Sequence, residues 1–295
     1  MSNIFESAPE QFSSGTQKTV KIFGARTRFW EYGNPDGATL VLIHGFRGDH
    51  HGLELIAGYL SDFRVIVPDL PGFGKSEALP AIKHSLSSFA GWLNTFTEKI
   101  LPHQTFDLVG HSFGSIICSY FAASRPEKIK RLILINPISE PALEGNQKIM
   151  SYLAEAYYEL GARLPQALGF PLLRSKIVTL ISSKFMAKNS DPALQRFIDG
   201  QHLAYFGAFS SRTALLEAYQ TSISETAAHF APVLSIPTLM IVAECDDLGT
   251  LQTQQAMAQN ISHCTLKIIP HVGHLIHYET PQTAAKLIRD FTGKN

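Results

Sequence analysis

Residues 106–114 read FDLVGHSFG, a short apolar run followed by a serine between glycines. The run 106–109 is typical of a buried strand. Residues 110–114 match the pattern G-x-S-x-G at the point where a helical segment begins. Glycines on both sides of Ser112 remove side chains that would collide in a sharp turn. Such a turn exposes the Ser112 hydroxyl and leaves the Phe113 N–H free to donate to an oxyanion, so this stretch predicts a nucleophilic serine.

Similar apolar runs recur along the chain and alternate with helical segments. The runs are 40–43, 64–67, 106–109, 131–135, 238–242 and 266–269, and the helical segments are 53–60, 87–101, 113–124, 251–259 and 283–291. Strands that are apolar throughout are typical of parallel sheets, which are buried on both faces. The alternation therefore predicts an α/β fold with right-handed crossovers. Two β-rich runs, Thr19–Phe23 and Thr27–Tyr32, are joined through Gly24-Ala25 and predict an antiparallel hairpin before this core.

The alternation stops between Pro137 and Pro232. This stretch has no clear strand, several helical patterns (149–160, 192–206 and 212–219) and many aromatic residues. We expect a helical cap at 137–231, inserted into a core formed by residues 1–136 and 232–295. Aromatic side chains at helical spacing pack within a core more often than they line a pocket, but some are expected to line an apolar pocket.

The serine turn and three further segments, described next, resemble the α/β-hydrolase superfamily, and the resemblance covers nearly the whole chain. His44-Gly45-Phe46 directly follows the run 40–43. In the family, the N–H after this His-Gly completes an oxyanion hole, so the resemblance implies Phe46 and Phe113 as the two donors. Residues 69–76 (DLPGFGKS) resemble the structural loop after the family's fourth strand. They also mimic the end of a P-loop, but Asp69 stands where that motif needs glycine, so nucleotide binding is not expected.

Residues 273–281 (GHLIHYETP) resemble the family segment G-H-x-x-H-x-E-x-P. The resemblance implies His274 as the base that takes the Ser112 proton and returns it to the leaving group. Two other histidines compete for this role. His271 lies in the loop before the glycine, and His277 is expected to cap or pack on the following helix.

The acid that would orient His274 has two candidates. The family places it after the penultimate strand, within G-x-x-D, and residues 243–247 (AECDD) follow the run 238–242 here. Aligning Ala243 with the family glycine implies Asp246, and Asp247 is the alternative. The order Ser112, Asp246, His274 is the one expected for this fold.

Charge and cysteine content do not point to several other classes of protein. Lys and Arg number 25, as do Asp and Glu, so the formal net charge is zero and indicates neither nucleic acid nor an anionic membrane as a partner. Three scattered cysteines indicate reduced thiols. No apolar stretch approaches the roughly 20 residues that span a bilayer, and the first residues lack a signal-peptide pattern. We expect a soluble cytoplasmic protein, and the resemblance implies a monomer or homodimer.

No cofactor or metal is expected. No G-x-G-x-x-G follows a strand, and His50-His51 has no third ligand at useful spacing, which favours a solvated or pocket-rim loop.

A serine nucleophile argues against haloalkane dehalogenases and epoxide hydrolases, which use aspartate.

The expected function is cleavage of a carboxylic ester of a small, apolar substrate through an acyl-enzyme. Two alternatives stay open. A carbon–carbon bond hydrolase of 2-hydroxy-6-oxo-dienoates would use the same triad, although those enzymes often have S-M-G-G where residues 112–115 are SFGS. A small-molecule receptor with little turnover would use the same fold.

Overall fold

The computed structural model describes residues 15–143 and 148–293. Its centre is an eight-stranded sheet in the order β1-β2-β4-β3-β5-β6-β7-β8. The strands are β1 (Thr16–Ile22), β2 (Ala25–Gly33), β3 (Thr39–Ile43), β4 (Arg64–Pro68), β5 (Phe106–His111), β6 (Ile129–Ile135), β7 (Thr238–Ala243) and β8 (Cys264–Ile269). β1 pairs antiparallel with β2, and β2 pairs antiparallel with β4, whereas the remaining pairs are parallel. The predicted α/β fold with an N-terminal hairpin is confirmed.

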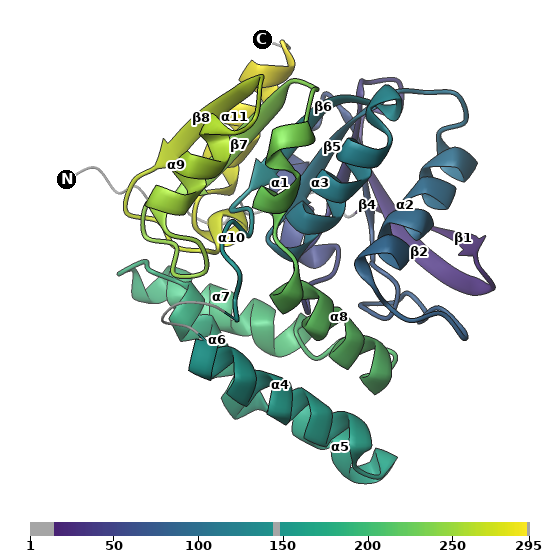
Figure 1. Cartoon of the computed structure of the whole chain (residues 1–295), viewed down its shortest axis with the longest axis vertical. Coiled ribbons are helices and arrows are strands. Elements are labelled where there is room, and N and C mark those ends of the chain that lie inside the picture. Colours follow the sequence, from purple (N-terminus) through teal and green to yellow (C-terminus); the bar gives the residue numbers. More distant parts are fainter. Residues whose placement is uncertain (1–14, 144–147, 294–295) are drawn as a thin grey trace.

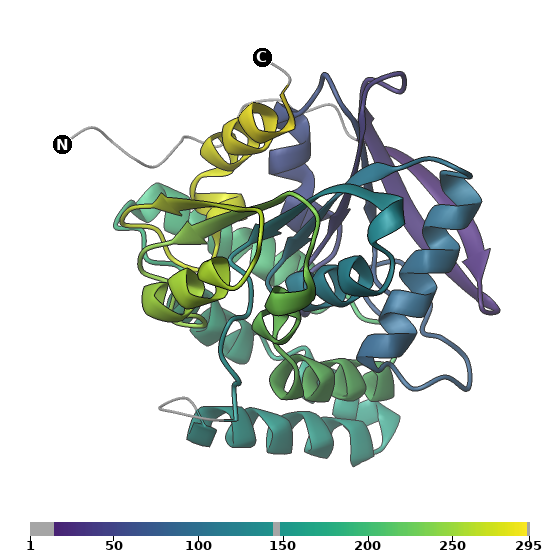
Figure 2. The ribbon, with the colours of Figure 1, turned by 45° about the horizontal axis from the view of Figure 1, so that its top comes forward.

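Helices cover both faces of the sheet (Figures 1 and 2). Along β3, Leu40 and Leu42 belong to one hydrophobic cluster and Val41 and Ile43 to another, because successive side chains of a strand point to opposite faces. The first cluster includes residues of α1 (His51–Tyr59) and α11 (Pro281–Thr292), and the second includes residues of α2 (Leu86–Ile100), α3 (Phe113–Ser124) and α9 (Leu251–Gln259). The central strands are therefore buried on both faces.

The last strand departs from the expected pattern. The apolar run 266–269 predicts a strand buried on both faces, but within β8 only Ile269 is buried, and Ile268 is exposed. β8 pairs only with β7 and forms the edge of the sheet. Apolar composition alone does not distinguish an edge strand from a central one, because exposure depends on which elements cover it.

Among the described residues between β6 and β7, five helices form a layer of their own at one end of the molecule (Figure 1). They are α4 (Lys148–Arg163), α5 (Gln166–Leu173), α6 (Lys176–Met186), α7 (Pro192–Tyr205) and α8 (Arg212–Ser224). We call α4–α8 the cap. Short helices complete the chain: η1 (Pro126–Lys128), η3 (Ala227–Val233) and α10 (Ile276–Glu279). None of the described helices combines the length and apolar character needed to cross a membrane.

Candidate active site

Ser112 lies in the turn between β5 and α3, with a φ of 52° and a ψ of −120°. A non-glycine residue rarely adopts a positive φ, so this turn stores backbone strain that the surrounding packing must hold. The flanking glycines allow that packing. A Cβ on Gly114 would lie 2.3 Å from the Ile43 carbonyl oxygen, and one on Gly110 would lie 2.6 Å from the Gly114 carbonyl oxygen. Because these two glycines lack side chains, the ends of β3 and β5 can lie close to the turn and hold Ser112 in its strained conformation.

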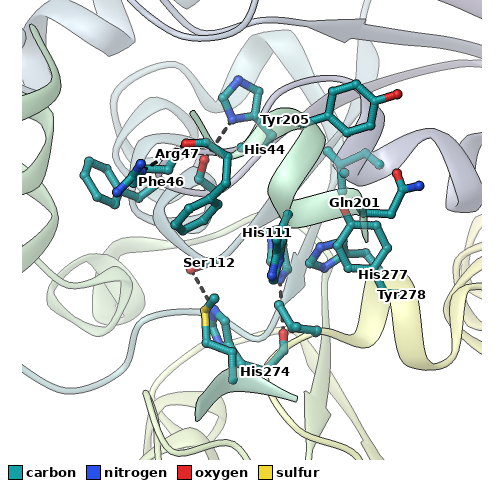
Figure 3. Close-up of a pocket in the computed structure, with 18 of the residues that line it drawn as sticks. His44, Phe46, Arg47, His111, Ser112, Gln201, Tyr205, His274, His277 and Tyr278 are labelled. Carbon is teal, nitrogen blue, oxygen red and sulfur yellow. Dashed lines mark hydrogen bonds between the residues drawn. The ribbon is translucent and has the colours of Figure 1, made fainter. Parts of the chain in front are cut away.

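His274 and Asp246 complete a hydrogen-bonded chain that starts at Ser112 (Figure 3 shows its first link). The His274 Nε2 atom lies 2.8 Å from Ser112 Oγ, although 162 residues separate them. On the other side of the ring, Nδ1 lies 2.9 Å from Oδ2 and 3.0 Å from Oδ1 of Asp246. An imidazole that donates its Nδ1–H to Asp246 leaves Nε2 free to accept the Ser112 hydroxyl proton. All three side chains are buried.

The two candidate acids occupy different environments. Asp246 contacts His274 and accepts a hydrogen bond from the Leu248 N–H at 2.8 Å. Asp247 is more exposed and forms an ion pair with Lys188, beyond the end of α6. Of the two neighbouring aspartates, the structure therefore brings Asp246 to the histidine and directs Asp247 to the cap.

Two buried polar residues that the sequence interpretation did not single out hold the His274 loop. The Asn136 side-chain amide donates to the carbonyl oxygens of Gly273 and His274, at 3.1 and 2.9 Å, and its Oδ1 accepts from the Ala243 N–H at 2.8 Å. Asn136 directly follows β6 and has a φ of 42°. A polar residue directly after a buried strand is the sequence signal that could have drawn attention to it.

Glu279 is fully buried and links the same loop to the cap. One carboxylate oxygen accepts from the Gly273 N–H at 2.8 Å, and the other accepts from the N–H groups of Lys188 and Asn189 at 2.9 and 2.8 Å. A buried carboxylate is tolerated when it is hydrogen-bonded in this way. The glutamate of G-H-x-x-H-x-E-x-P thus positions the histidine loop.

The loop after β3 lies against the serine turn and carries Phe46. A Cβ on Gly45 would lie 3.2 Å from Ser112 Cβ, so glycine permits this approach. His44 supports the loop, since its Nδ1 donates to the Gly45 carbonyl oxygen at 2.8 Å and its Nε2 accepts from the Leu70 N–H at 2.9 Å. Burial lowers the pKa of His44, which favours the neutral ring that this pair of hydrogen bonds requires. Phe46 and Ser112 line the same cavity.

Arg47 ties this loop to the cap. Its backbone has a φ of 58°, and its buried guanidinium donates to the carbonyl oxygens of Phe206 at 3.0 Å and Leu173 at 2.7 Å. These carbonyls lie at the C-terminal ends of α7 and α5, where a positive charge is favourable. The guanidinium also lies over the Phe206 ring, 4.5 Å from its centroid.

Core and cap together enclose a cavity of about 150 Å³ at Ser112. Its apolar wall includes Phe46, Leu53, Met186, Phe206, Leu248 and Leu275. Cap aromatics therefore do contribute to the wall. The nearby polar groups in Figure 3 include His111, Gln201 and His277.

Three of the histidines in the cavity wall are neutral near pH 7. Burial lowers the pKa of His111 to about 3 and that of His202 to about 4, and it lowers the pKa of His277 well below 6.5. The Nδ1 atoms of His202 and His277 are buried and have no hydrogen-bond partner. His277 is one of the two competing bases and is expected to cap or pack on the following helix. Capping does not occur, because Thr280 is the N-cap of α11, and the His277 ring packs against His111 with ring centroids 4.3 Å apart. His271 is exposed and lies beside Glu244.

The expectation for His50-His51 needs two corrections. His50 is buried rather than solvated, and a third potential metal ligand, Asp49, directly precedes the pair, with donor atoms of all three residues within 4.8 Å of one another. Both Nδ1 atoms already lie beside carboxylates, His50 beside Asp69 at 2.9 Å and His51 beside Asp49 at 3.0 Å. The cluster therefore has internal hydrogen bonds that a metal ion would have to replace.

The chain is similar to known proteins in both sequence and structure. A family model described as alpha/beta hydrolase fold matches residues 38–281. Lipase 3 of Moraxella sp. (strain TA144) is 23% identical over 275 residues, which cover 91% of this chain and 81% of that protein. The (E)-2-((N-methylformamido)methylene)succinate hydrolase of Acinetobacter baylyi is 23% identical over 278 residues, which cover 90% of this chain and 94% of that protein. A thermophilic esterase from Thermogutta terrifontis superposes with a TM-score of 0.75 at 23% identity, covering 96% of this chain and 98% of that one.

Proposed function

The chain belongs to the alpha/beta hydrolase family, since the family model matches residues 38–281, and on this basis we propose that it is a serine hydrolase acting on carboxylic esters. The observation that carries the proposal is the 2.8 Å contact between Ser112 Oγ and His274 Nε2, at a strained turn and with Asp246 behind the ring. A nucleophile, a base and a group that orients the base are the parts that acyl transfer requires.

In the proposed reaction, Ser112 attacks the acyl carbonyl carbon while His274 removes the hydroxyl proton. The Phe46 and Phe113 N–H groups hold the oxyanion of the tetrahedral intermediate, and loss of one such donor typically costs about 10²–10³ in rate. His274 then gives the proton to the departing alkoxide, which leaves an acyl-enzyme. A water molecule that gives its proton to His274 then attacks the acyl carbon. The bond from this carbon to Ser112 Oγ breaks, His274 returns the proton to Ser112 and the acid is released, while Asp246 stabilises the charged imidazole in both halves.

The size and lining of the cavity support a small, largely apolar substrate. The cavity measures about 150 Å³, and aromatic and aliphatic side chains from both core and cap form much of its wall. Apolar walls contribute binding energy through burial of the substrate's hydrocarbon part, and a few polar groups fix its orientation.

One observation favours a second candidate, a carbon–carbon bond hydrolase. The neutral imidazoles of His111, His202 and His277 lie in the cavity wall, and two of them have an Nδ1 atom without a partner. A neutral imidazole both donates and accepts hydrogen bonds, which suits the keto and hydroxyl oxygens of a 2-hydroxy-6-oxo-dienoate.

Labelling with a fluorophosphonate, followed by a substrate panel, tests the proposal. We expect folded protein to be labelled at Ser112 and to release p-nitrophenol from short acyl esters, and we expect Ser112→Ala to abolish both. Faster turnover of a 2-hydroxy-6-oxo-dienoate than of any ester would select the carbon–carbon hydrolase. Saturable ligand binding with no labelling and no turnover would instead indicate a receptor.

A further inference from the structure

The cap carries most of the exposed large apolar side chains of the described chain. Fourteen such side chains are exposed, and ten of them belong to α4–α7: Ile149, Met150, Tyr152, Leu153, Leu160, Leu168, Ile177, Ile181, Phe185 and Leu203. Single exposed apolar residues are ordinary, but a concentration on one part of a protein indicates an interaction surface.

Helix α6 has its apolar side turned outward. Ile177, Ile181 and Phe185 follow one another at intervals of four residues, and they are 72%, 65% and 47% exposed. The residues that α6 buries are instead small and polar, Thr179 and Ser183. A helix on the surface of a globular protein normally buries its apolar stripe against the core. The stripe of α6 is therefore available to something outside the chain.

The same helix is basic. Lys176 and Lys184 are exposed, α6 contains no acidic residue, and neither lysine forms an ion pair within residues 15–143 and 148–293. Over residues 148–188 the chain has six basic residues (Lys148, Arg163, Arg174, Lys176, Lys184 and Lys188) and two acidic ones (Glu155 and Glu159). Because Lys188 is paired with Asp247, the local excess is three positive charges, in a chain whose formal net charge is zero.

Helix α4 repeats the outward apolar arrangement. Ile149, Leu153 and Leu160 are exposed at spacings of four and seven residues, which place them on one side of the helix. The buried residues of α4 are Ser151, Tyr158 and Gly161. Both α4 and α6 belong to the cap layer at the end of the molecule in Figure 1.

We propose that α6, through its exposed apolar stripe and its lysines, docks the protein on an anionic lipid surface. A basic helix with an apolar stripe lies in the plane of a membrane interface, where its apolar side chains enter the headgroup boundary and its lysines attract anionic lipids. A second copy of the chain fits this helix less well. A two-fold contact through α6 would bring lysines against lysines with no acidic residue of α6 to neutralise them.

Docking through α6 would also hold one wall of the cavity close to the lipid. Met186, the last residue of α6, lines the cavity, and its carbonyl oxygen accepts a hydrogen bond from the His274 N–H at 3.0 Å. An apolar substrate dissolved in the membrane would then be supplied near Ser112. Docking itself does not rest on the proposed function, because it uses no group of the reaction.

Co-sedimentation with vesicles tests docking directly. We expect the protein to bind vesicles of phosphatidylcholine with about 30% phosphatidylglycerol, to bind pure phosphatidylcholine at least about tenfold less, and to be released from the anionic vesicles by about 0.5 M salt. Ser112→Ala should bind equally, so failure of the esterase proposal and failure of docking are separate results.

Three surface variants locate the contact. Combined Ile177→Ser, Ile181→Ser and Phe185→Ser, or combined Lys176→Glu and Lys184→Glu, should each weaken binding by about tenfold or more because they remove apolar burial or charge attraction. The matched control, Val233→Ser with Ile268→Ser, replaces exposed apolar residues outside the cap and should bind normally. All are exposed positions, and circular dichroism should show unchanged folding.

Two results would overturn the proposal. One is the absence of binding to anionic vesicles, or binding that the α6 variants leave unchanged. The other is a dimer in sedimentation analysis that the Ile177, Ile181 and Phe185 variant converts to a monomer while vesicle binding is absent, which would assign the surface to a second copy of the chain.

Discussion

The Arg47 guanidinium donates a hydrogen bond of 2.7 Å to the carbonyl oxygen of Leu173, across 126 residues of sequence. Arg47 directly follows Phe46, whose N–H we propose as an oxyanion donor, and Leu173 is the last residue of α5 in the cap. The carbonyl oxygens at a helix C-terminus lack partners within the helix and favour a cation. This contact therefore couples the position of the cap to the loop that would hold the oxyanion.

Replacing Arg47 should damage both stability and activity. In Arg47→Met, the cap carbonyls of Leu173 and Phe206 lose their donor, and we expect about 2–3 kcal/mol of destabilisation because buried hydrogen bonds to a charged group are worth that much. We expect kcat to fall as well, since the loop that carries Phe46 loses its tether. Urea unfolding and ester kinetics measure the two effects.

Arg163→Met is the control for this substitution. Arg163 forms an exposed ion pair with Glu159 one helical turn away, so its loss should change stability by less than about 0.5 kcal/mol. Arg47→Lys should not restore the wild-type values, because an ammonium cannot reach two carbonyls with the planar fork of a guanidinium. Equal effects of Arg47→Met and Arg163→Met would contradict the tether.

The neighbouring aspartates offer a direct test of the acid. Asp246→Asn should lower kcat by about 10⁴, because an asparagine cannot hold His274 in the tautomer that accepts the Ser112 proton. Asp247→Asn removes a partly exposed ion pair with Lys188 that does not involve His274, and should keep kcat within about tenfold of wild type. The reverse ranking in steady-state kinetics would assign the acid to Asp247.

Stability should fall as the solution becomes acidic. Burial lowers the pKa of His111 to about 3, whereas the same imidazole in an unfolded chain titrates near 6.5. Between these values the unfolded chain binds more protons than the folded one, so the free energy of unfolding decreases by up to about 1.4 kcal/mol per pH unit for this one group. Burial also lowers the pKa of His202 and His277, so these two histidines likewise make the free energy of unfolding decrease as the pH falls. Above about pH 6.5, the pKa of His111 in the unfolded chain, its contribution to the free energy of unfolding is fully present.

Urea unfolding at several pH values between about 7 and 5 measures this slope. In His111→Gln, the free energy of unfolding should fall less steeply as the pH decreases, because up to one proton fewer is bound on unfolding. This expectation holds whatever the change in absolute stability. The control is Gln252→Asn, which changes an exposed side chain that carries no titratable group and should leave the slope unchanged. An identical slope in wild type and His111→Gln would show that His111 is not the group concerned.

Two glycines in helices should respond in opposite ways to alanine. In Gly114→Ala the new Cβ would lie 2.3 Å from the Ile43 carbonyl oxygen, which is strand backbone, and we expect about 3 kcal/mol of destabilisation with loss of activity. In Gly91→Ala, within α2, the new Cβ meets nothing within 4 Å, so a gain of about 0.5–1 kcal/mol is expected from the lower entropy of the unfolded chain. Thermal unfolding of both variants checks the pair.

Several features of the candidate site could be predicted because their signals are local. The strand, the turn and the helix around Ser112 come from one continuous stretch of sequence, Phe106–Ser124, and the loop that carries Phe46 directly follows β3. The alternation of apolar runs likewise predicted the parallel sheet, because burial on both faces imposes the same composition on each central strand. The same reasoning was wrong about β8, for which it predicted burial on both faces. Whether a strand lies at the edge of a sheet depends on its neighbours in space, which its own residues do not encode.

Other features depend on residues that are distant in sequence. Asn136 and Glu279 act through backbone groups of the His274 loop and the cap. The surface of α6 is a similar case. Its composition is ordinary for a helix, and only the packing of the cap shows that Ile177, Ile181 and Phe185 face outward.

The sequence by itself determined the fold family, the serine turn and the histidine segment, because short-range patterns of apolar and glycine residues specify local backbone geometry. Only the tertiary structure decided which aspartate meets His274, which histidines line the cavity and which apolar side chains of α6 face outward. The physical reason is that hydrogen bonds, burial and electrostatic attraction act over distances in space, and folding brings together groups that the sequence keeps more than a hundred residues apart.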